Sequence, residues 1–248
     1  MYLELNPDFE FARGFLQQVD LHFEAEKVAI HVARNTIKKL SFASHDLIVK
    51  SFGVPNIFNQ LAYCFFRDTK ARRSFQNALR LISFHIATAT PVAFCEGYHF
   101  GLIQRSYYIS LRVDYDYDFH DINFERKPGS EKLFKQFAEF THVMHKAGFL
   151  HLDYTPGNIL IKEKESNFYF TLIDINRMKI GPVSWRAGVN SLGKIYFKEA
   201  QMKIVSHRYA ELAGIPETMV WATLQKSRQA FERKKKIKQF LRFWQKKN

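Results

Sequence analysis

The segment from Phe149 to Asp174 constrains the fold of this chain more than any other part. It reads "FLHLDYTPGNILIKEKESNFYFTLID", in which two apolar runs flank the polar turn "EKESN". Runs of this kind joined by a short polar turn predict a β-hairpin. Asp153 precedes its first strand, Asn158 begins that strand, and Asp174 ends the second. Because a hairpin brings its ends together, we expect Asn158 and Asp174 to be neighbours, with Asp153 beside them.

These three polar side chains suggest a site for a hard cation. Two carboxylates and an amide oxygen are ligands that suit Mg²⁺, with water and phosphate oxygens filling the remaining positions. Taken singly, each residue is more often a turn former, since Asp, Asn, Pro and Gly all favour turns. The combination in one segment favours the metal site.

Composition indicates a globular protein with a sizeable core. The chain has 248 residues, of which 46% are hydrophobic and 16% aromatic, enough for one two-lobed domain or two small ones. Its two cysteines, Cys64 and Cys95, do not suggest a disulfide framework. The first residues show no basic region followed by an apolar run, and no apolar stretch approaches the ~20 residues that span a bilayer. We expect a cytoplasmic protein, soluble or peripheral to a membrane.

Positive charge is concentrated at the C-terminal end. The segment 226–248 contains ten Lys and Arg and one acid, Glu232, so it carries +9 of the total net charge of +13. Ile237, Phe240, Leu241 and Trp244 recur there at helical spacing. A basic helix with an aromatic stripe suits an anionic membrane surface. It would also suit RNA, or the stripe would pack on the rest of the protein.

The order of predicted elements indicates an α+β chain with two lobes. Strand-like runs are followed by a helix, a further strand pair, a second helix that begins at Ser130 and ends at Gly148, the hairpin, and then helices. The first lobe thus has five antiparallel strands with one helix inserted after the third. We predict a β-rich lobe, a mostly helical lobe and a basic amphipathic helix over 1–112, 113–225 and 226–248. The runs of the first lobe are 27–32, 37–42, 46–52, about 70–84, 91–97 and 107–113.

The hairpin segment resembles the protein-kinase-like superfamily. "HLDYTPGNIL" is similar to its catalytic loop H-x-D-x-x-x-x-N, and "LID" at 172–174 to its metal-binding aspartate motif. The resemblance implies a bilobal α+β kinase-like fold and the use of ATP and Mg²⁺. It implies Asp153 as the catalytic base, with His151 bracing the loop, and Asn158 and Asp174 as Mg²⁺ ligands. Lys50, in "LIVKSF", would pair with the nucleotide phosphates.

Several departures argue against a conventional protein kinase. No glycine lies between Gly14 and Gly53, so the glycine-rich loop is missing, and the turn "ARNT" would cover the phosphates through Asn35 and Thr36. The helix "KARRSFQNALRL" offers no glutamate to the lysine, so Gln76, Ser74 or another acid would substitute. Ile-Asn-Arg follows the metal aspartate, and no Ala-Pro-Glu motif closes an activation segment.

A narrower family resembles the chain over residues 27–177. Bacterial lipopolysaccharide core kinases, which include Kdo kinase and heptose kinases, are similar in their compact length, the absent glycine-rich loop, "KARRSFQNALRL" followed by "TATPVAF", the catalytic loop, and "LIDINR". The resemblance implies phosphorylation of a sugar hydroxyl, with Kdo linked to lipid A as the expected acceptor, at the inner face of the inner membrane. The implied partners are ATP, a lipid-anchored core sugar and the anionic membrane surface, with no DNA expected. Arg177 and Lys179 would hold an anionic sugar or phosphate, or are surface charges.

Two other functions stay open at this point. One is another small-molecule or RNA-associated kinase of the same fold. The other is a membrane-bound pseudokinase scaffold, which the missing glycine-rich loop and helix glutamate favour. The presence of Lys50, Asp153, Asn158 and Asp174 opposes the scaffold, since a scaffold has no need of all four.

Overall fold

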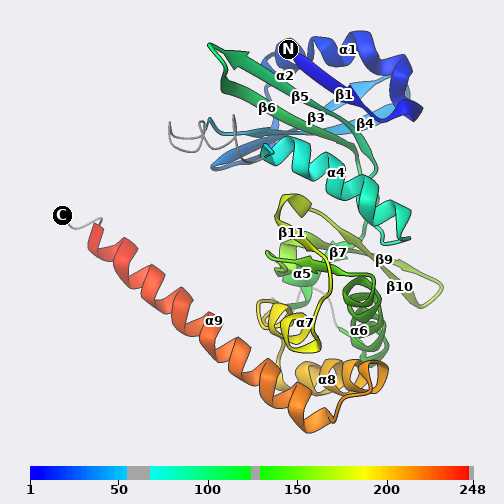
Figure 1. Ribbon diagram of the computed structural model, residues 1–248, viewed down its shortest axis with the longest axis vertical. Helices are drawn as coiled ribbons and strands as arrows, with labels where there is room; N and C mark the ends of the chain where they lie inside the picture. Colours follow the sequence, from blue (N-terminus) through cyan, green and yellow to red (C-terminus); the bar gives the residue numbers. More distant parts are fainter. Residues whose placement is uncertain (55–67, 124–128, 246–248) are drawn as a thin grey trace. The chain divides into compact units, whose positions relative to one another are not determined.

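The chain forms two compact units in the computed structural model, which describes residues 1–54, 68–123 and 129–245, without the side chains of 241–243 and 245. The first unit comprises Met1–Asp114 and Asp174–Arg177, and the second comprises Tyr115–Ile173 and Met178–Asn248. Figure 1 shows the elements of both. The chain leaves the first unit after Asp114, two residues beyond the predicted end of the β-rich lobe at 112. Cys64 lies outside the described residues.

The first unit is built on a six-stranded antiparallel sheet in the order β1-β5-β6-β4-β3-β2. The predicted strands are all present, but β1 was not predicted; it pairs with β5, with Tyr2 opposite Glu96. The strands are β1 (Tyr2–Leu5), β2 (Ala29–Val32), β3 (Asn35–Phe42), β4 (His45–Phe52), β5 (Pro91–His99) and β6 (Leu102–Leu111).

Each face of this sheet has its own apolar core. The 3₁₀ helix η1 (Pro7–Ala12) and helices α1 (Arg13–Gln17) and α2 (Val19–Ala25) cover one face, and helix α4 (Lys70–Ser83) covers the other (Figure 1). Side chains alternate between the faces along a strand. In β4, Leu47 and Val49 therefore join the first core, whereas Phe52 joins the α4 core. Lys50, two residues before Phe52, lies on the α4 face as well.

A buried carboxylate fastens α4 to the sheet. Glu96 of β5 is fully buried and accepts hydrogen bonds from the hydroxyl groups of Thr69 and Tyr98. Arg72 of α4 adds an ion pair with a guanidinium-to-carboxylate distance of 3.5 Å. Thr69 also caps the helix by accepting a hydrogen bond from the Arg72 amide at 3.1 Å. A buried charge needs such partners, so the start of α4 is held firmly on β5.

The second unit contains the predicted hairpin. Strands β9 (Ile159–Lys164) and β10 (Asn167–Leu172) pair antiparallel, and β7 (Tyr117–Asp118) adds a third strand beside β9. The connecting residues Glu165 and Ser166 both have positive φ, 49° and 62°. Two such residues are typical of the tight turns that match the twist of hairpin strands. A second, two-stranded sheet pairs β8 (Phe149–His151) with β11 (Met178–Ile180).

Helices form the rest of the second unit. The predicted helix α6 (Glu131–Lys146) is capped at its start by the Ser130 hydroxyl, which accepts from the Leu133 amide, and Gly148 follows it with a φ of 84°. Both end signals read from the sequence are thus confirmed. The other helices are α5 (Phe119–Asn123), α7 (Trp185–Leu192), α8 (Glu199–Ala213) and α9 (Glu217–Gln245).

The basic C-terminal segment belongs to a longer helix than expected. Helix α9 is continuous over 29 residues and begins at Glu217, nine residues before the segment 226–248 that we predicted as a separate helix. Its first half carries buried Val220 and Leu224, which explains why the helix starts within the globular part. Contacts continue as far as Lys235, whose ammonium group lies 4.7 Å from the centre of the Tyr196 ring.

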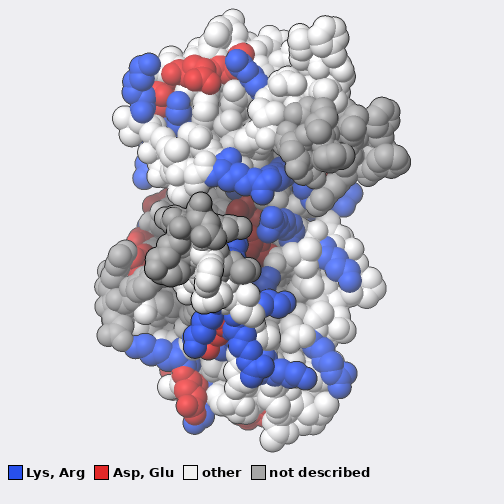
Figure 2. Space-filling view, turned by 90° about the vertical axis from the view of Figure 1, so that its left-hand side faces the viewer, with Lys and Arg blue, Asp and Glu red and all other residues white. Residues whose placement is uncertain are grey.

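The far part of α9 presents apolar and basic side chains to solvent. Ile237, Phe240 and Trp244 are 59%, 61% and 56% exposed, so these three do not pack on the domain. Figure 2 views the side toward which α9 extends in Figure 1, and it shows basic side chains gathered over this helix. In the described part of the chain, no helix combines the length and apolar character needed to cross a membrane.

Candidate active site

The loop after β8 is fixed by a buried histidine. His151 is fully buried, and its Nδ1 accepts a hydrogen bond from the Asp153 amide at 3.1 Å. Nε2 must then carry the ring proton, which it donates to the Ile173 carbonyl at 3.2 Å. The imidazole therefore acts as a neutral brace that ties the Asp153 backbone to the end of the hairpin. The role in catalysis that the resemblance implies for His151 stays a prediction.

Two further contacts stabilise the same loop. Tyr154 is fully buried, and its hydroxyl group lies 2.8 Å from that of Thr141 on α6. Burial raises the pKa of Tyr154, so it stays protonated. The ammonium group of Lys194 donates a hydrogen bond to the Leu152 carbonyl. Sequence reasoning missed Tyr154 and Lys194, although an aromatic residue directly after Asp153 could have indicated an anchor for the loop.

Asn158 is oriented by both its side chain and its backbone. It ends the short 3₁₀ helix η2 (Pro156–Asn158), one residue before β9 begins. Its side-chain amide donates to the Asp153 carbonyl at 2.8 Å, and its own carbonyl accepts from the Ile173 amide at 3.0 Å. The amide nitrogen is thereby engaged, while the described residues leave the Oδ1 atom of Asn158 available as a ligand.

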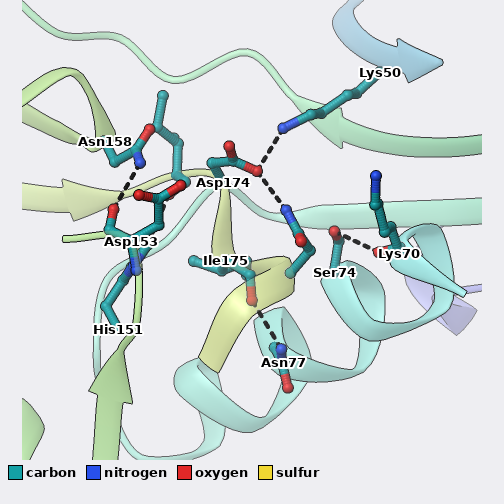
Figure 3. A network of polar contacts seen from close by, with 11 residues as sticks. Lys50, Lys70, Ser74, Asn77, His151, Asp153, Asn158, Asp174 and Ile175 are labelled. Carbon is teal, nitrogen blue, oxygen red and sulfur yellow. Dashed lines mark hydrogen bonds and ion pairs between the residues drawn. The ribbon is translucent and has the colours of Figure 1, made fainter. Parts of the chain in front are cut away.

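Asp174 pairs with Lys50 in the first unit. The Lys50 ammonium lies 2.5 Å from Asp174 Oδ1 (Figure 3). The side-chain amide of Asn176 donates to the same oxygen at 2.5 Å. No donor among the described residues reaches Oδ2. Asp174 also has a φ of 54°, a left-handed conformation that side-chain-bearing residues rarely adopt. Such strain concentrates at functional sites, where the surrounding structure maintains it.

Helix α4 does not supply the lysine's partner through the residues we expected. Ser74 donates its hydroxyl hydrogen to the Lys70 carbonyl within the same helix, and Gln76 has no hydrogen bond to Lys50. Lys50 is instead paired by Asp174. Asn77 of α4 does contact this region, since its side-chain amide donates to the Ile175 carbonyl at 2.8 Å (Figure 3). Asn77 lies among mostly apolar buried residues of α4, and the sequence analysis did not single it out.

The peptide bond between Ile173 and Asp174 joins the candidate residues of the second unit to those of the first. Ile173 bonds to Asn158 and His151 of the second unit, and the next residue, Asp174, belongs to the first unit. The roles predicted for Asp153, Asn158, Asp174 and Lys50 stay predictions.

The remaining predicted residues are distributed over both units. Asn35 and Thr36 begin β3, and the Asn35 Oδ1 atom is buried with no hydrogen-bond partner in the described part of the chain. The turn before them approaches Gly53 so closely that a Cβ there would lie 2.6 Å from the Arg34 carbonyl oxygen. Arg177 is an exposed residue of the 3₁₀ helix η3 in the first unit, and Lys179 is an exposed residue of β11 in the second.

The residues present fit Mg²⁺ better than a transition metal. No group of three or more His, Cys, Asp or Glu side chains within the described ranges is arranged to hold a metal ion. Mg²⁺ does not require such a group, because it is commonly bound through one or two protein oxygens together with water and phosphate oxygens. Asp174 Oδ2 and Asn158 Oδ1 are oxygens of the right kind, with no protein donor engaging them in the described structure.

Comparisons with known proteins show the family and the fold of the chain. No curated protein matches the chain. A solved structure titled "WaaP in complex with acyl carrier protein" matches with a TM-score of 0.65 at 18% identity, covering 94% of this chain and 98% of that one, which supports the kinase-like α+β fold. The sequence model of the lipopolysaccharide kinase (Kdo/WaaP) family matches residues 53–214, well over half of the chain. The chain therefore belongs to this family of kinases that phosphorylate sugar hydroxyls.

Proposed function

We propose that the chain transfers the γ-phosphoryl group of ATP to a hydroxyl group of Kdo linked to lipid A, at the cytoplasmic face of the inner membrane. The observation that carries this proposal is the family match, because residues 53–214 contain Asp153, Asn158 and Asp174. The hydrogen bonds that orient these three residues support it.

Each residue has a distinct part in the proposed transfer. Asp153 orients the sugar hydroxyl and takes its proton as the oxygen bonds to the γ-phosphorus and the bond to the departing ADP breaks. Lys50 binds the nucleotide phosphates. Asn158 and Asp174 would hold Mg²⁺, which neutralises phosphate charge when it is bound. Positioning and charge neutralisation supply most of the catalysis in such a site.

Acceptor choice decides between Kdo and the other core sugars. The purified chain is incubated with γ-labelled ATP and one of three acceptors: lipid A without core sugars, lipid A bearing Kdo, and the same molecule extended by heptose. We expect label on the Kdo-bearing acceptor, with Asp153→Asn as the inactive control. Label that requires heptose would move the assignment to a heptose kinase. ATP binding without transfer to any of the acceptors would support the pseudokinase scaffold.

The exposed end of α9 supports peripheral membrane binding. Five basic residues from Arg233 to Lys238 accompany Ile237, Phe240 and Trp244, all exposed. Basic residues near an anionic surface contribute roughly 1 kcal/mol each, and apolar side chains add to this by insertion. A kinase that stays at the membrane surface would encounter an acceptor anchored in the bilayer more often.

Two variants separate the membrane role from the packing of α9. Truncation after Lys236 keeps Lys235 and its contact with the Tyr196 ring, and a triple change of Ile237, Phe240 and Trp244 to Ser keeps the charge. Both should weaken binding to anionic vesicles and turnover of the lipid-linked acceptor, while turnover of a soluble Kdo acceptor is unchanged. Normal vesicle binding by both variants would refute the membrane role. Since the WaaP structure contains an acyl carrier protein, loss of carrier-protein binding instead would assign the helix end to that partner class.

A further inference from the structure

Four cationic side chains from four parts of the first unit surround a fifth, that of Lys70. Lys70 begins α4, and its ammonium group lies 5.8 Å from the centre of the Phe52 ring. The Lys50 ammonium lies 5.3 Å from the same ring centre. The remaining members are Arg34 between β2 and β3, Arg73 of α4, and Arg177 of η3. Burial, and then the charges of Arg34, Arg177, Arg73 and Lys50, lower the pKa of Lys70.

This arrangement is unfavourable for the isolated chain. Like charges that are close together repel one another, and partial burial strengthens the repulsion because water screens it less. The charges that act most strongly on the Lys70 ammonium, those of Arg34, Arg177, Arg73 and Lys50, are all positive. An anion with several charges bound among these side chains would reverse the effect, as occurs at phosphate-binding sites.

The missing glycine-rich loop suggests which anion this is. In kinases that possess it, such a loop covers the nucleotide phosphates. Here the cationic side chains stand near Lys50, the proposed phosphate-binding lysine. We propose that the ammonium group of Lys70 contacts the phosphate chain of the nucleotide beside Lys50 and takes over part of the role of the absent loop. This inference rests on the proposed use of ATP.

The surrounding structure holds Lys70 in place for this role. Thr69, the preceding residue, is bonded to the buried carboxylate of Glu96, and the Lys70 carbonyl accepts a hydrogen bond from Ser74 at 2.8 Å. Figure 3 shows the Lys70 side chain directed away from the helix, on the side where Lys50 reaches Asp174. A ligand that meets a preordered side chain loses less conformational entropy on binding. Glu96 is therefore a positioning residue for Lys70.

The test compares ligands with and without phosphates. Lys70→Gln removes the charge and keeps most of the side chain, Lys70→Arg keeps the charge, and Lys203→Gln is the matched control on an exposed, paired lysine of α8. Dissociation constants are measured by calorimetry for ATP, adenosine and inorganic triphosphate. For Lys70→Gln we expect about a tenfold loss for ATP and for triphosphate, and no change for adenosine. Lys70→Arg should restore most of the loss, and Lys203→Gln should resemble the unaltered chain.

The Tm measured without ligand distinguishes a binding role of Lys70 from a role in the stability of the fold. Because Lys70→Gln removes a repelled charge, its Tm should be equal to or higher than that of the unaltered chain. A lower Tm, an equal loss of affinity for adenosine, or unchanged ATP affinity would each overturn the proposal.

The same measurements distinguish this inference from the proposed function. Lys70-dependent triphosphate binding without ATP turnover would refute the kinase assignment and retain the anion site. Normal ATP turnover and binding in Lys70→Gln would refute only the role of Lys70. An unaltered chain that binds neither ATP nor triphosphate would refute both.

Discussion

Acid should destabilise the second unit through His145. This residue of α6 is buried at 4% exposure, with Nδ1 3.0 Å from the Tyr209 hydroxyl on α8 and Nε2 3.5 Å from the Ser191 hydroxyl on α7. A Cβ on Gly188 would lie 2.6 Å from its Nδ1, so little room remains around the ring. Burial, together with the charge of His142, lowers the pKa of His145 to about 3.

The size and sign of the effect follow from proton linkage. An unfolded histidine has a pKa of about 6.5, so between pH 6.5 and 3 the unfolded chain binds a proton that the folded chain excludes. The stability contributed by neutral His145 is therefore complete above pH 6.5 and is lost as the pH falls toward 3. Each pH unit in this window changes the free energy of unfolding by about 1.4 kcal/mol. From pH 7 to pH 5 the expected loss is about 2 kcal/mol, and His142, whose pKa is also lowered, acts in the same direction.

Tryptophan fluorescence during urea unfolding measures this effect in the relevant unit. The three tryptophans, Trp185, Trp221 and Trp244, all belong to the second unit. His145→Gln is the control, because an amide can bond to both hydroxyl groups but takes up no proton in this range. Its free energy of unfolding should fall by about 2 kcal/mol less between pH 7 and pH 5 than that of the unaltered chain. Identical pH dependence of the two proteins would show that His145 does not carry the linkage.

Three further predictions concern the candidate site and its support. Asp153→Asn should lower kcat by a factor of about 10²–10⁴ at unchanged ATP affinity and Tm, measured by ADP release; near-normal turnover would contradict its role as the base. Lys50→Met should raise the KM for ATP or abolish turnover, and a nucleotide complex with this ammonium directed away from the phosphates would refute the assignment. Glu96→Ala should destabilise the first unit by about 3 kcal/mol, because it leaves Arg72 without its buried partner, and hydrogen exchange of α4 should reveal the loss.

Local patterns predicted much of the fold. The hairpin, the helix that begins at Ser130 and the sheet strands other than β1 follow from alternation, helical spacing and end signals within short segments. Strand β1 escaped prediction because it is four residues long and gains its stability by pairing with β5, about ninety residues away. Its sequence "YLEL" carries little intrinsic signal without that partner.

The candidate site likewise has residues that the sequence predicted and contacts that it did not. Asp153, Asn158 and Asp174 lie in one continuous segment, so their pattern was visible in the sequence. The contacts of Asn77 with Ile175 and of Glu96 with α4 join residues far apart in the chain, and no local pattern encodes them. The sequence shows that α4 has no glutamate to pair with Lys50. The pairing of Lys50 with Asp174 instead became known from the structure.

The pairing of Lys50 with Asp174, instead of with a glutamate of α4, affects how nucleotide and metal would bind together. The helix is anchored by its own Arg72 to a sheet carboxylate, so α4 does not depend on Lys50 for its position. Lys50 is left with Asp174 as its bonded acid, and Asn176 donates to the same oxygen. If Asp174 also holds Mg²⁺, the lysine and the ion share one carboxylate, and each weakens the hold of the other on it. A phosphate chain that binds both cations relieves this competition, so Mg²⁺ and ATP would each strengthen the binding of the other.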